Sequence, residues 1–301
     1  LARADGTATY STPTESFPFY FSWSPRNELA LLRNGTAGLT LDLTSIDGEA
    51  ATPLQSIEAG QPLYFSWSPD GETVVTHVGE DRLELNDFTN SDSLGPLPGA
   101  FQSPVWTERG IYAIERGPRD QPLVQVSGGE SRAIAKVQAP TTMVATNDGS
   151  RVAVQSVGDL GDAVTAAFQS LPMLPANRVV VVETADGSHD TASAGPALAY
   201  FWAPAGDRLL VLDIVPGPQA RWSIWAGGES EEIVRFDPDP GFIRDLVPFF
   251  DQYSQSISLW APDGSAFAFP GTIDGSSGVW VQQLDGELDR ISSGTWVSWS
   301  P

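Results

Sequence analysis

One phrase recurs along the chain and limits its possible folds more than any other feature. It consists of a short strand that ends in an aromatic residue, a tight turn, and a second strand, and it is clearest at 65–75, FSWSPDGETVV. Successive copies are spaced 39, 44, 57 or 58 residues apart. Repeats of roughly 40 residues with this content are typical of β-propeller blades, each a four-stranded sheet. The seven copies place Trp23, Trp67, Trp106, Ala145, Trp202, Trp260 and Trp299 at the aromatic position.

Each unit has the pattern strand, turn, strand, loop, strand, turn, strand. The second strands, such as 74–78, are apolar throughout, as expected when neighbouring sheets cover both faces. Third strands end in Asp-Gly or Gly-Gly pairs, which supply the positive φ of two-residue hairpin turns. We therefore expect an all-β protein, a propeller that forms a single domain over residues 1–301. Its first strands are predicted near 17–23, 63–67, 103–106, 142–145, 199–202, 257–260 and 295–299.

Seven first strands predict seven blades, with six as the alternative if one unit is a spacer. Residues 1–10 resemble the end of a third strand, an Asp-Gly turn and a fourth strand, whereas 296–299 resemble a first strand. We expect these strands to pair in one blade, because such closure removes free sheet edges. The second strand of that blade is lacking, so we expect the sequence to be trimmed at one or both ends. The units around Trp106 and Ala145 depart from the pattern and are expected to be irregular.

The phrase FSWSPDGETVV and its copies resemble the WD40-like (PD40) repeat of TolB-like propellers, and this resemblance extends over nearly the whole chain. It implies the propeller fold. Function is less constrained, because this propeller serves as a binding module, a scaffold and an enzyme domain. The resemblance to TolB implies a binding role and an extracytoplasmic place: periplasmic, secreted or on a membrane-anchored ectodomain.

The charge of the chain is strongly negative, with 38 acidic against 16 basic side chains and a formal net charge of −22. A field of this sign repels phosphate backbones, so nucleic acid is not expected as a partner. Lys136 is the only lysine beside fifteen arginines, which indicates a GC-rich bacterial genome; a cation-attracting surface is the alternative. No apolar run is long enough to form a transmembrane segment.

The two long spacings predict insertions at 158–177 and 237–256. Connectivity places both on the face opposite the Trp-containing turns. Long insertions in a compact repeat fold are frequently functional. Two interpretations stay open: the apolar side chains plug the ring, or they bind a protein partner or small ligand. The partner-binding candidates are Phe168, Leu171, Met173, Phe242, Phe249, Phe250 and Tyr253.

No catalytic residue and no cofactor site is predicted. The chain has no G-x-S-x-G nucleophile motif, and His77 and His189 are too few for the His-rich metal centre of pectic lyases that share this repeat. Clustered carboxylates make Asp237, Asp239 and Asp251 candidates for calcium, with solvated surface as the other interpretation. The favoured function is a non-enzymatic binding or scaffold module acting through the insertion face. The alternative is a hydrolase or lactonase-type enzyme that uses carboxylates and a divalent cation.

Overall fold

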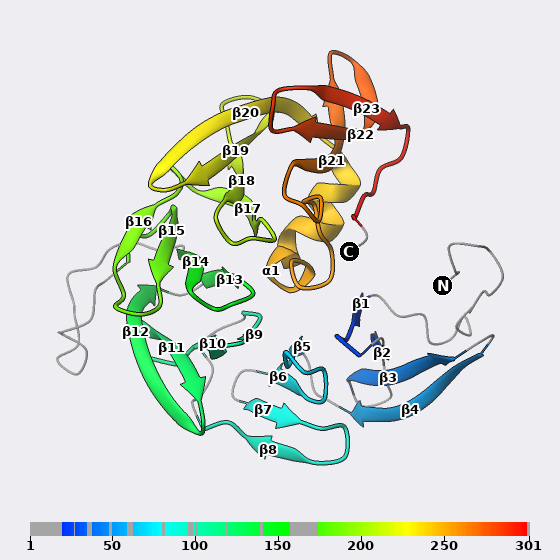
Figure 1. Ribbon diagram of the computed structural model, residues 1–301, viewed down its shortest axis with the longest axis vertical. Coiled ribbons are helices and arrows are strands. Elements are labelled where there is room, and N and C mark those ends of the chain that lie inside the picture. The colour runs from blue at the N-terminus through cyan, green and yellow to red at the C-terminus, as the bar shows by residue number, and fades with distance from the viewer. Residues whose placement is uncertain are drawn as a thin grey trace.

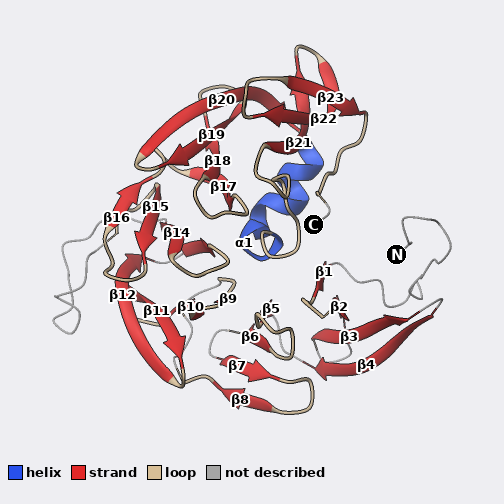
Figure 2. Cartoon of the chain, in the orientation of Figure 1, coloured by secondary structure: helices blue, strands red, loops and turns tan. Residues whose placement is uncertain are grey.

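A computed structural model describes residues 20–26, 28–34, 38–47, 50–58, 63–79, 82–95, 99, 102–117, 120–138, 141–156 and 174–299. The described chain is almost entirely strand, and its sheets follow one another around a central region that holds a few helical turns (Figures 1 and 2). No helix in these ranges is long and apolar enough to cross a membrane.

The first four repeat units each form a four-stranded antiparallel sheet in chain order. The first contains β1 (Tyr20–Trp23), β2 (Glu28–Asn34), β3 (Leu39–Asp47) and β4 (Ala50–Glu58). The second contains β5 (Leu63–Trp67), β6 (Val74–Val78), β7 (Arg82–Asn86) and β8 (Ser91–Ser93). The third contains β9 (Val105–Thr107), β10 (Gly110–Ile114), β11 (Asp120–Ser127) and β12 (Glu130–Gln138). The fourth contains β13 (Thr141–Ala145), β14 (Arg151–Ser156), β15 (Val179–Glu183) and β16 (His189–Thr191).

The fifth and sixth units share one seven-stranded sheet. It contains β17 (Ala197–Trp202), β18 (Leu209–Ile214), β19 (Ala220–Ala226), β20 (Glu229–Pro238), β21 (Ala266–Ile273), β22 (Ser276–Gln283) and β23 (Leu288–Ser292). The end of β20 pairs with β21 through Asp237–Thr272 and Pro238–Gly271. Because this contact is only two residues long, the two units remain separate blades joined at one corner.

The turn between first and second strands has the same hydrogen bonds wherever its polar residues are kept. In the second unit the main-chain N–H of Thr73 donates to Ser68 Oγ at 3.1 Å, and that of Glu72 donates to Asp70 Oδ1 at 3.0 Å. Gly71 adopts a φ of +70°, which a side chain would strain. These turns define one side of the molecule, called here the turn face; the links between units lie on the opposite side, the link face.

The irregularity predicted for the third and fourth units is wrong, since both form ordered four-stranded sheets. In the fourth unit, Thr146 Oγ1 accepts from Arg151 N at 3.1 Å and Asp148 Oδ1 accepts from Ser150 N at 3.0 Å. The loss of the aromatic at Ala145 therefore leaves the turn intact, because the turn depends on the hydroxyl and carboxylate that follow.

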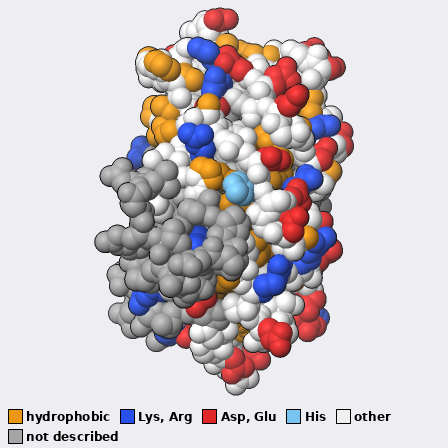
Figure 3. Space-filling model, turned by 90° about the vertical axis from the view of Figure 1, so that its left-hand side faces the viewer, with side chains coloured by type: hydrophobic (Ala, Val, Ile, Leu, Met, Phe, Trp, Pro, Cys, Tyr) orange, Lys and Arg blue, Asp and Glu red, His pale blue; other side chains and the backbone are white. Residues whose placement is uncertain are grey.

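Apolar strand faces pack between neighbouring units and make up the core. The largest cluster surrounds Trp222, which is fully buried and whose ring lies 6.1 Å from Phe236 in a stacked arrangement. The outer strands are solvent-exposed, as the patterns of β8, β16 and β23 show. Acidic side chains are scattered over the outer surface seen in Figure 3 together with arginines, rather than gathered in one patch.

The predicted closure involves residues 1–10, which lie outside the described residues. At the other end, Trp299 forms a single antiparallel bridge with Ser258, and its N–H donates to the Ser258 carbonyl at 2.8 Å. The segment 257–260, predicted as a first strand, is joined to β21 by one bridge between Trp260 and Phe267.

Candidate functional site

The second predicted insertion lies at the centre of the arc of sheets (Figure 1). After β20 the chain forms three short helical turns: a π-helical turn Phe242–Leu246, a 3-10 turn Val247–Phe249 and α1 (Phe250–Tyr253). Asp239 begins this segment by accepting hydrogen bonds from the N–H groups of Gly241 and Phe242 at 2.8 and 3.2 Å. Residues 239–257 are called here the plug.

Gln252 connects the plug to three blades. Its Oε1 accepts from Phe65 N at 2.9 Å and its Nε2 donates to the Phe65 carbonyl at 2.8 Å. The same amide group donates to Tyr20 Oη at 2.9 Å and accepts from Ser103 Oγ at 3.3 Å. The innermost strand β5 thus has its inward main-chain groups paired by a side chain, which satisfies them as a further strand would.

Asp251 is a buried carboxylate beside this amide. Ser103 N and Gln252 N donate to its oxygens at 3.2 and 3.0 Å. Burial raises the pKa of Asp251 to about 6, and the two main-chain donors offset part of that effect. Burial, and then the nearby Asp251 charge, raise the pKa of Tyr64. The carboxylate is therefore a structural member of the plug.

The apolar side of the plug packs against the fifth blade. The Phe250 ring lies 4.7 Å from that of Tyr200, and the Phe242 ring lies 6.5 Å from that of Trp222. Phe242 and Phe250 are only 1% and 3% exposed. Both side chains are therefore buried against the fifth blade and are not accessible at the surface.

The remaining partner-binding candidates have different positions. Phe249 is 48% exposed, and Tyr253 is half-buried with its ring 5.2 Å from that of Tyr20. Phe168, Leu171 and Met173 lie outside the described residues.

Two adjoining pockets open on the turn face, the side opposite the one predicted to be functional. The larger has a volume of about 590 Å³ and the smaller about 340 Å³. Both are lined by ends of first strands and by their turns, with the last part of the plug between them. The residues shared by both pockets are Trp23, Ala145, Asn147, Ser254 and Gln255. The two pockets thus form the lobes of one depression, called here the turn-face pocket.

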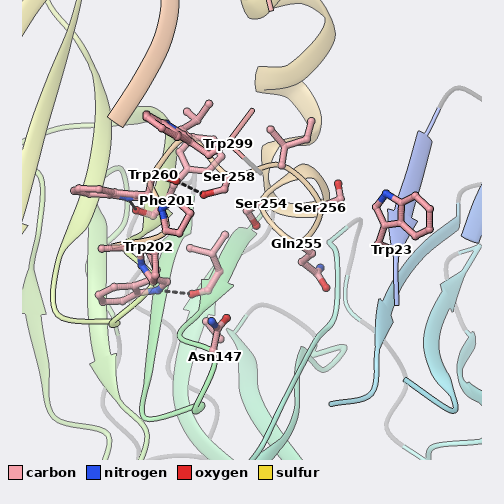
Figure 4. A pocket seen from close by; sticks show the side chains of 17 residues that line it. Trp23, Asn147, Phe201, Trp202, Ser254, Gln255, Ser256, Ser258, Trp260 and Trp299 are labelled. Carbon is pink, nitrogen blue, oxygen red and sulfur yellow. Dashed lines mark hydrogen bonds between the residues drawn. The ribbon is translucent and has the colours of Figure 1, made fainter. Parts of the chain in front are cut away.

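Aromatic faces supply much of the wall of this pocket. Trp23 is 47% exposed and lies on the far side of the plug from Trp202, Trp260 and Trp299 (Figure 4). The indole N–H of Trp202 donates to the Val144 carbonyl at 3.2 Å, which fixes the ring against the preceding blade. Trp260 makes the same kind of bond to its preceding blade and is almost fully buried.

Neutral polar groups supply the rest. Asn147 lies on the fourth turn and is exposed, and Gln255 projects from the plug; both line the pocket (Figure 4). The amide nitrogen of Gln255 donates to Ser103 Oγ and the Pro104 carbonyl at 2.9 and 3.1 Å. This leaves the Gln255 carbonyl oxygen as an acceptor. Serines 254, 256 and 258 add hydroxyl groups.

Among the residues that the structure describes, no charged side chain lines the larger lobe, although 18% of the chain is charged. Glu108 is the one charged residue among the described residues of the smaller lobe. Sequence reasoning missed this pocket because it treated the Trp-containing turns as structural. The pocket could have been inferred from the repeat itself. Each first strand ends near the propeller axis, so the tryptophans at these ends come together on one face.

The calcium candidates do not come together. Asp237 is exposed at the end of β20, Asp239 caps the plug and Asp251 is buried. Within the described ranges, no three His, Asp or Glu side chains are grouped as metal ligands. His77 is buried with Nδ1 2.8 Å from the Gln102 carbonyl, whereas His189 is exposed on β16. The two imidazoles therefore belong to different parts of the molecule.

Comparison with known proteins defines the fold. No family model and no curated protein sequence matches the chain. Among solved structures, an oligogalacturonate lyase in complex with manganese is 16% identical with a TM-score of 0.62, over 93% of this chain and 79% of that one. The Cps50 (Swd1) β-propeller domain of Myceliophteria thermophila is 12% identical with a TM-score of 0.53, over 95% and 91%. A putative 6-phosphogluconolactonase from Bacteroides uniformis is 11% identical with a TM-score of 0.55, over 95% and 87%.

TolB from Acinetobacter baumannii is also similar, at 13% identity and a TM-score of 0.49 over 89% of this chain and 61% of that one. At these identities the similarity describes the fold alone. The chain has the WD40-like β-propeller fold, as its repeats predicted. The neighbours with the fold include proteins named as enzymes and a β-propeller domain whose name gives no activity, so the fold by itself does not identify a function.

Proposed function

We propose that the chain is a non-enzymatic, TolB-like binding module whose ligand or protein partner enters the turn-face pocket. The observation that carries the proposal is the make-up of that pocket: aromatic walls and neutral amides, with no charged residue among the described residues that line the larger lobe. Concave, largely apolar sites with a few polar groups are typical of ligand binding. General acid–base chemistry, and the activation of a serine as a nucleophile, need a titratable side chain, and the described residues of this lobe include no Asp, Glu, His or Lys.

The sequence predicts binding through the insertion face, whereas the burial of the plug aromatics favours the turn face. Phe242 and Phe250 are buried between the plug and the fifth blade, whereas Trp23 and Asn147 are exposed and line a pocket. An extracytoplasmic location belongs to the same proposal, as does the absence of nucleic acid among the partners, which rests on the net charge of −22.

The test is a ligand-observed NMR screen with a panel of two halves, neutral oligosaccharides and uncharged peptides. We expect at least one member to bind, and Trp23→Ala to weaken it. Trp296→Ala is the matched control, since Trp296 is 46% exposed and Trp23 47%, and Trp296 lines neither lobe. If no member binds, or if both variants bind equally well, the proposal is wrong.

A lactonase or hydrolase activity is the alternative, and the buried Asp251 with its raised pKa is the observation in its favour. Against it, both oxygens of this carboxylate accept main-chain hydrogen bonds. Incubation with δ-gluconolactone or trigalacturonate, each with and without Ca²⁺ and Mn²⁺, separates the two roles. Turnover that Asp251→Asn abolishes would favour the enzyme.

We also propose that the ring closes as seven blades, with 295–299 as the first strand of the last blade and residues 1–10 supplying its outer strands; six blades are the alternative. The position of Trp299 supports this. It pairs with Ser258 at the start of the preceding unit and lies in the same lobe as Trp260. Deletion of residues 1–10 should then lower the melting temperature, and an unchanged value would contradict closure.

A further inference from the structure

The turn-face pocket has features that narrow the class of ligand beyond binding in general. Three properties of the pocket indicate which class of ligand it binds: the charge of its lining, the exposed faces of its tryptophans, and the hydrogen-bonding capacity of its polar groups. We propose that it binds a neutral carbohydrate, with one sugar ring stacked on Trp23 and its hydroxyl groups held by Asn147 and Gln255. This inference rests on the proposed function and names its ligand class.

Charge excludes ionic ligands first. An anionic ligand would enter a protein of net charge −22, and the described lining of the larger lobe offers no arginine, lysine or histidine to offset the repulsion. A cationic ligand would find no carboxylate among the same described lining residues and would lose hydration without compensation. The lobe is therefore suited to an uncharged molecule.

The aromatic faces indicate a ligand with flat apolar surfaces. Trp23 is 47% exposed at the rim shared by both lobes, and Trp202 and Trp299 are partly exposed within the larger one. Trp202 is held by its indole hydrogen bond, so its face is presented without loss of side-chain freedom on binding. The C–H faces of a pyranose ring match such surfaces, because indole combines a large apolar face with a polar edge.

The polar groups match hydroxyls. Each hydroxyl group both donates and accepts a hydrogen bond, and a side-chain amide offers both functions. Asn147 makes no side-chain hydrogen bond that the described residues record, and Gln255, whose amide nitrogen alone is used in hydrogen bonds to Ser103 and Pro104, lies between Trp23 and Trp202 in the view of Figure 4. Asn147 and Gln255 each line both lobes of the pocket, so they can reach a ligand in either one.

An extended peptide fits less well. Peptides that add a strand need unpaired main-chain groups on an exposed sheet edge. At the ring centre the inward groups of Phe65 are already bonded to Gln252. The larger lobe, at about 590 Å³, falls in the ordinary range for small-molecule sites, roughly 300–1,000 Å³. With the adjoining lobe it has room for more than one ring.

The test is isothermal titration with maltotriose, cellotriose, xylotriose and chitotriose, with trigalacturonate as the acidic counterpart and hexaproline, acetylated at its N-terminus and amidated at its C-terminus, as an uncharged peptide. We expect one neutral sugar to bind, trigalacturonate not to bind, and Trp23→Ala to weaken binding at least tenfold. Asn147→Ala should weaken it severalfold. Trp296→Ala should leave it unchanged, and Trp23→Phe, which keeps an aromatic face, should lie between parent and alanine variant. Melting temperatures confirm that each variant is folded.

The outcomes separate the inference from the function on which it rests. Binding of hexaproline, or of another uncharged peptide, that depends on Trp23 without sugar binding would overturn the carbohydrate class and keep the binding module. Trigalacturonate binding as tightly as the neutral sugars would overturn the charge argument. Sugar binding that Trp23→Ala and Asn147→Ala leave unchanged would overturn the site itself.

Discussion

Replacement of Gln252 by alanine tests whether the plug holds the blades together. The side chain is 5% exposed and pairs with both main-chain groups of Phe65, itself 1% exposed. In the alanine variant these two groups lose their partner, and a buried polar group left unpaired costs about 1–3 kcal/mol. The Tyr20 hydroxyl retains a partner, because it also donates to the main-chain carbonyl of residue 252, which the alanine variant keeps. We therefore expect a loss of about 3 kcal/mol in the free energy of unfolding.

Thermal unfolding followed by tryptophan fluorescence gives the measurement. A loss of this size corresponds to about 6 °C in a domain larger than 150 residues. Gln125→Ala is the control: that amide makes two hydrogen bonds, to the Arg109 carbonyl and from Arg132, on a solvent-exposed part of a sheet. It should cost less than about 1 kcal/mol, since water replaces the lost partners.

A conservative variant sharpens the same prediction. Gln252→Glu keeps the length and the acceptor, but replaces the amide donor to the Phe65 carbonyl by a carboxylate oxygen. At neutral pH it should be less stable than Gln252→Ala, because a buried charge would face a carbonyl. If Gln252→Ala melts within 1 °C of the parent protein, or if Gln125→Ala loses as much, the plug does not tie the blades and the reasoning is refuted.

Three further predictions follow from buried or strained positions. Burial raises the pKa of Asp251 from its usual 3.8 to about 6 in the folded protein, so its contribution to stability should fall as pH rises from about 4 to about 6. Across that window the free energy of unfolding of Asp251→Asn should increase by up to about 3 kcal/mol relative to that of the parent. Denaturation at several pH values measures this difference, and a constant difference would contradict the prediction. Trp222→Ala should cost about 3–5 kcal/mol in urea unfolding, since the ring is fully buried, and a loss below 1 kcal/mol would argue against its place in the core. Gly149→Ala should destabilise more than Gly227→Ala: both have positive φ, but only at Gly149 would a Cβ lie 2.3 Å from another atom, Thr107 Oγ1. Equal melting temperatures of these two variants would show that the close approach is relieved without cost.

Local features of the fold could be read directly from residue pattern. The apolar run at 74–78 and the Pro-Asp-Gly turn before it specify a strand pair by short-range physics: alternation, φ preference and a hydroxyl that caps the turn. The same holds at Thr146 and Asp148, where the aromatic is lost and the turn is kept. Because these signals are local, repetition alone was sufficient to predict blades.

The site depended on contacts between distant parts of the chain. Gln252 and Phe65 are 187 residues apart, and no local pattern indicates that one amide will satisfy the other's main chain. Phe242 and Phe250 would have the same apolar character in the sequence whether they were buried in the core or exposed to bind a partner. Only their packing against Trp222 and Tyr200 distinguishes these two roles.

What the sequence by itself determined, then, is the repeated unit, its turns and the tryptophan at the end of every first strand except the fourth, where Ala145 stands. What only the tertiary structure decided is where those residues meet. Trp23, Trp202 and Trp299 line one pocket because first strands of separate blades surround a common axis and the plug fills that axis beneath them. Convergence of this kind is a property of ring geometry, which no single repeat carries.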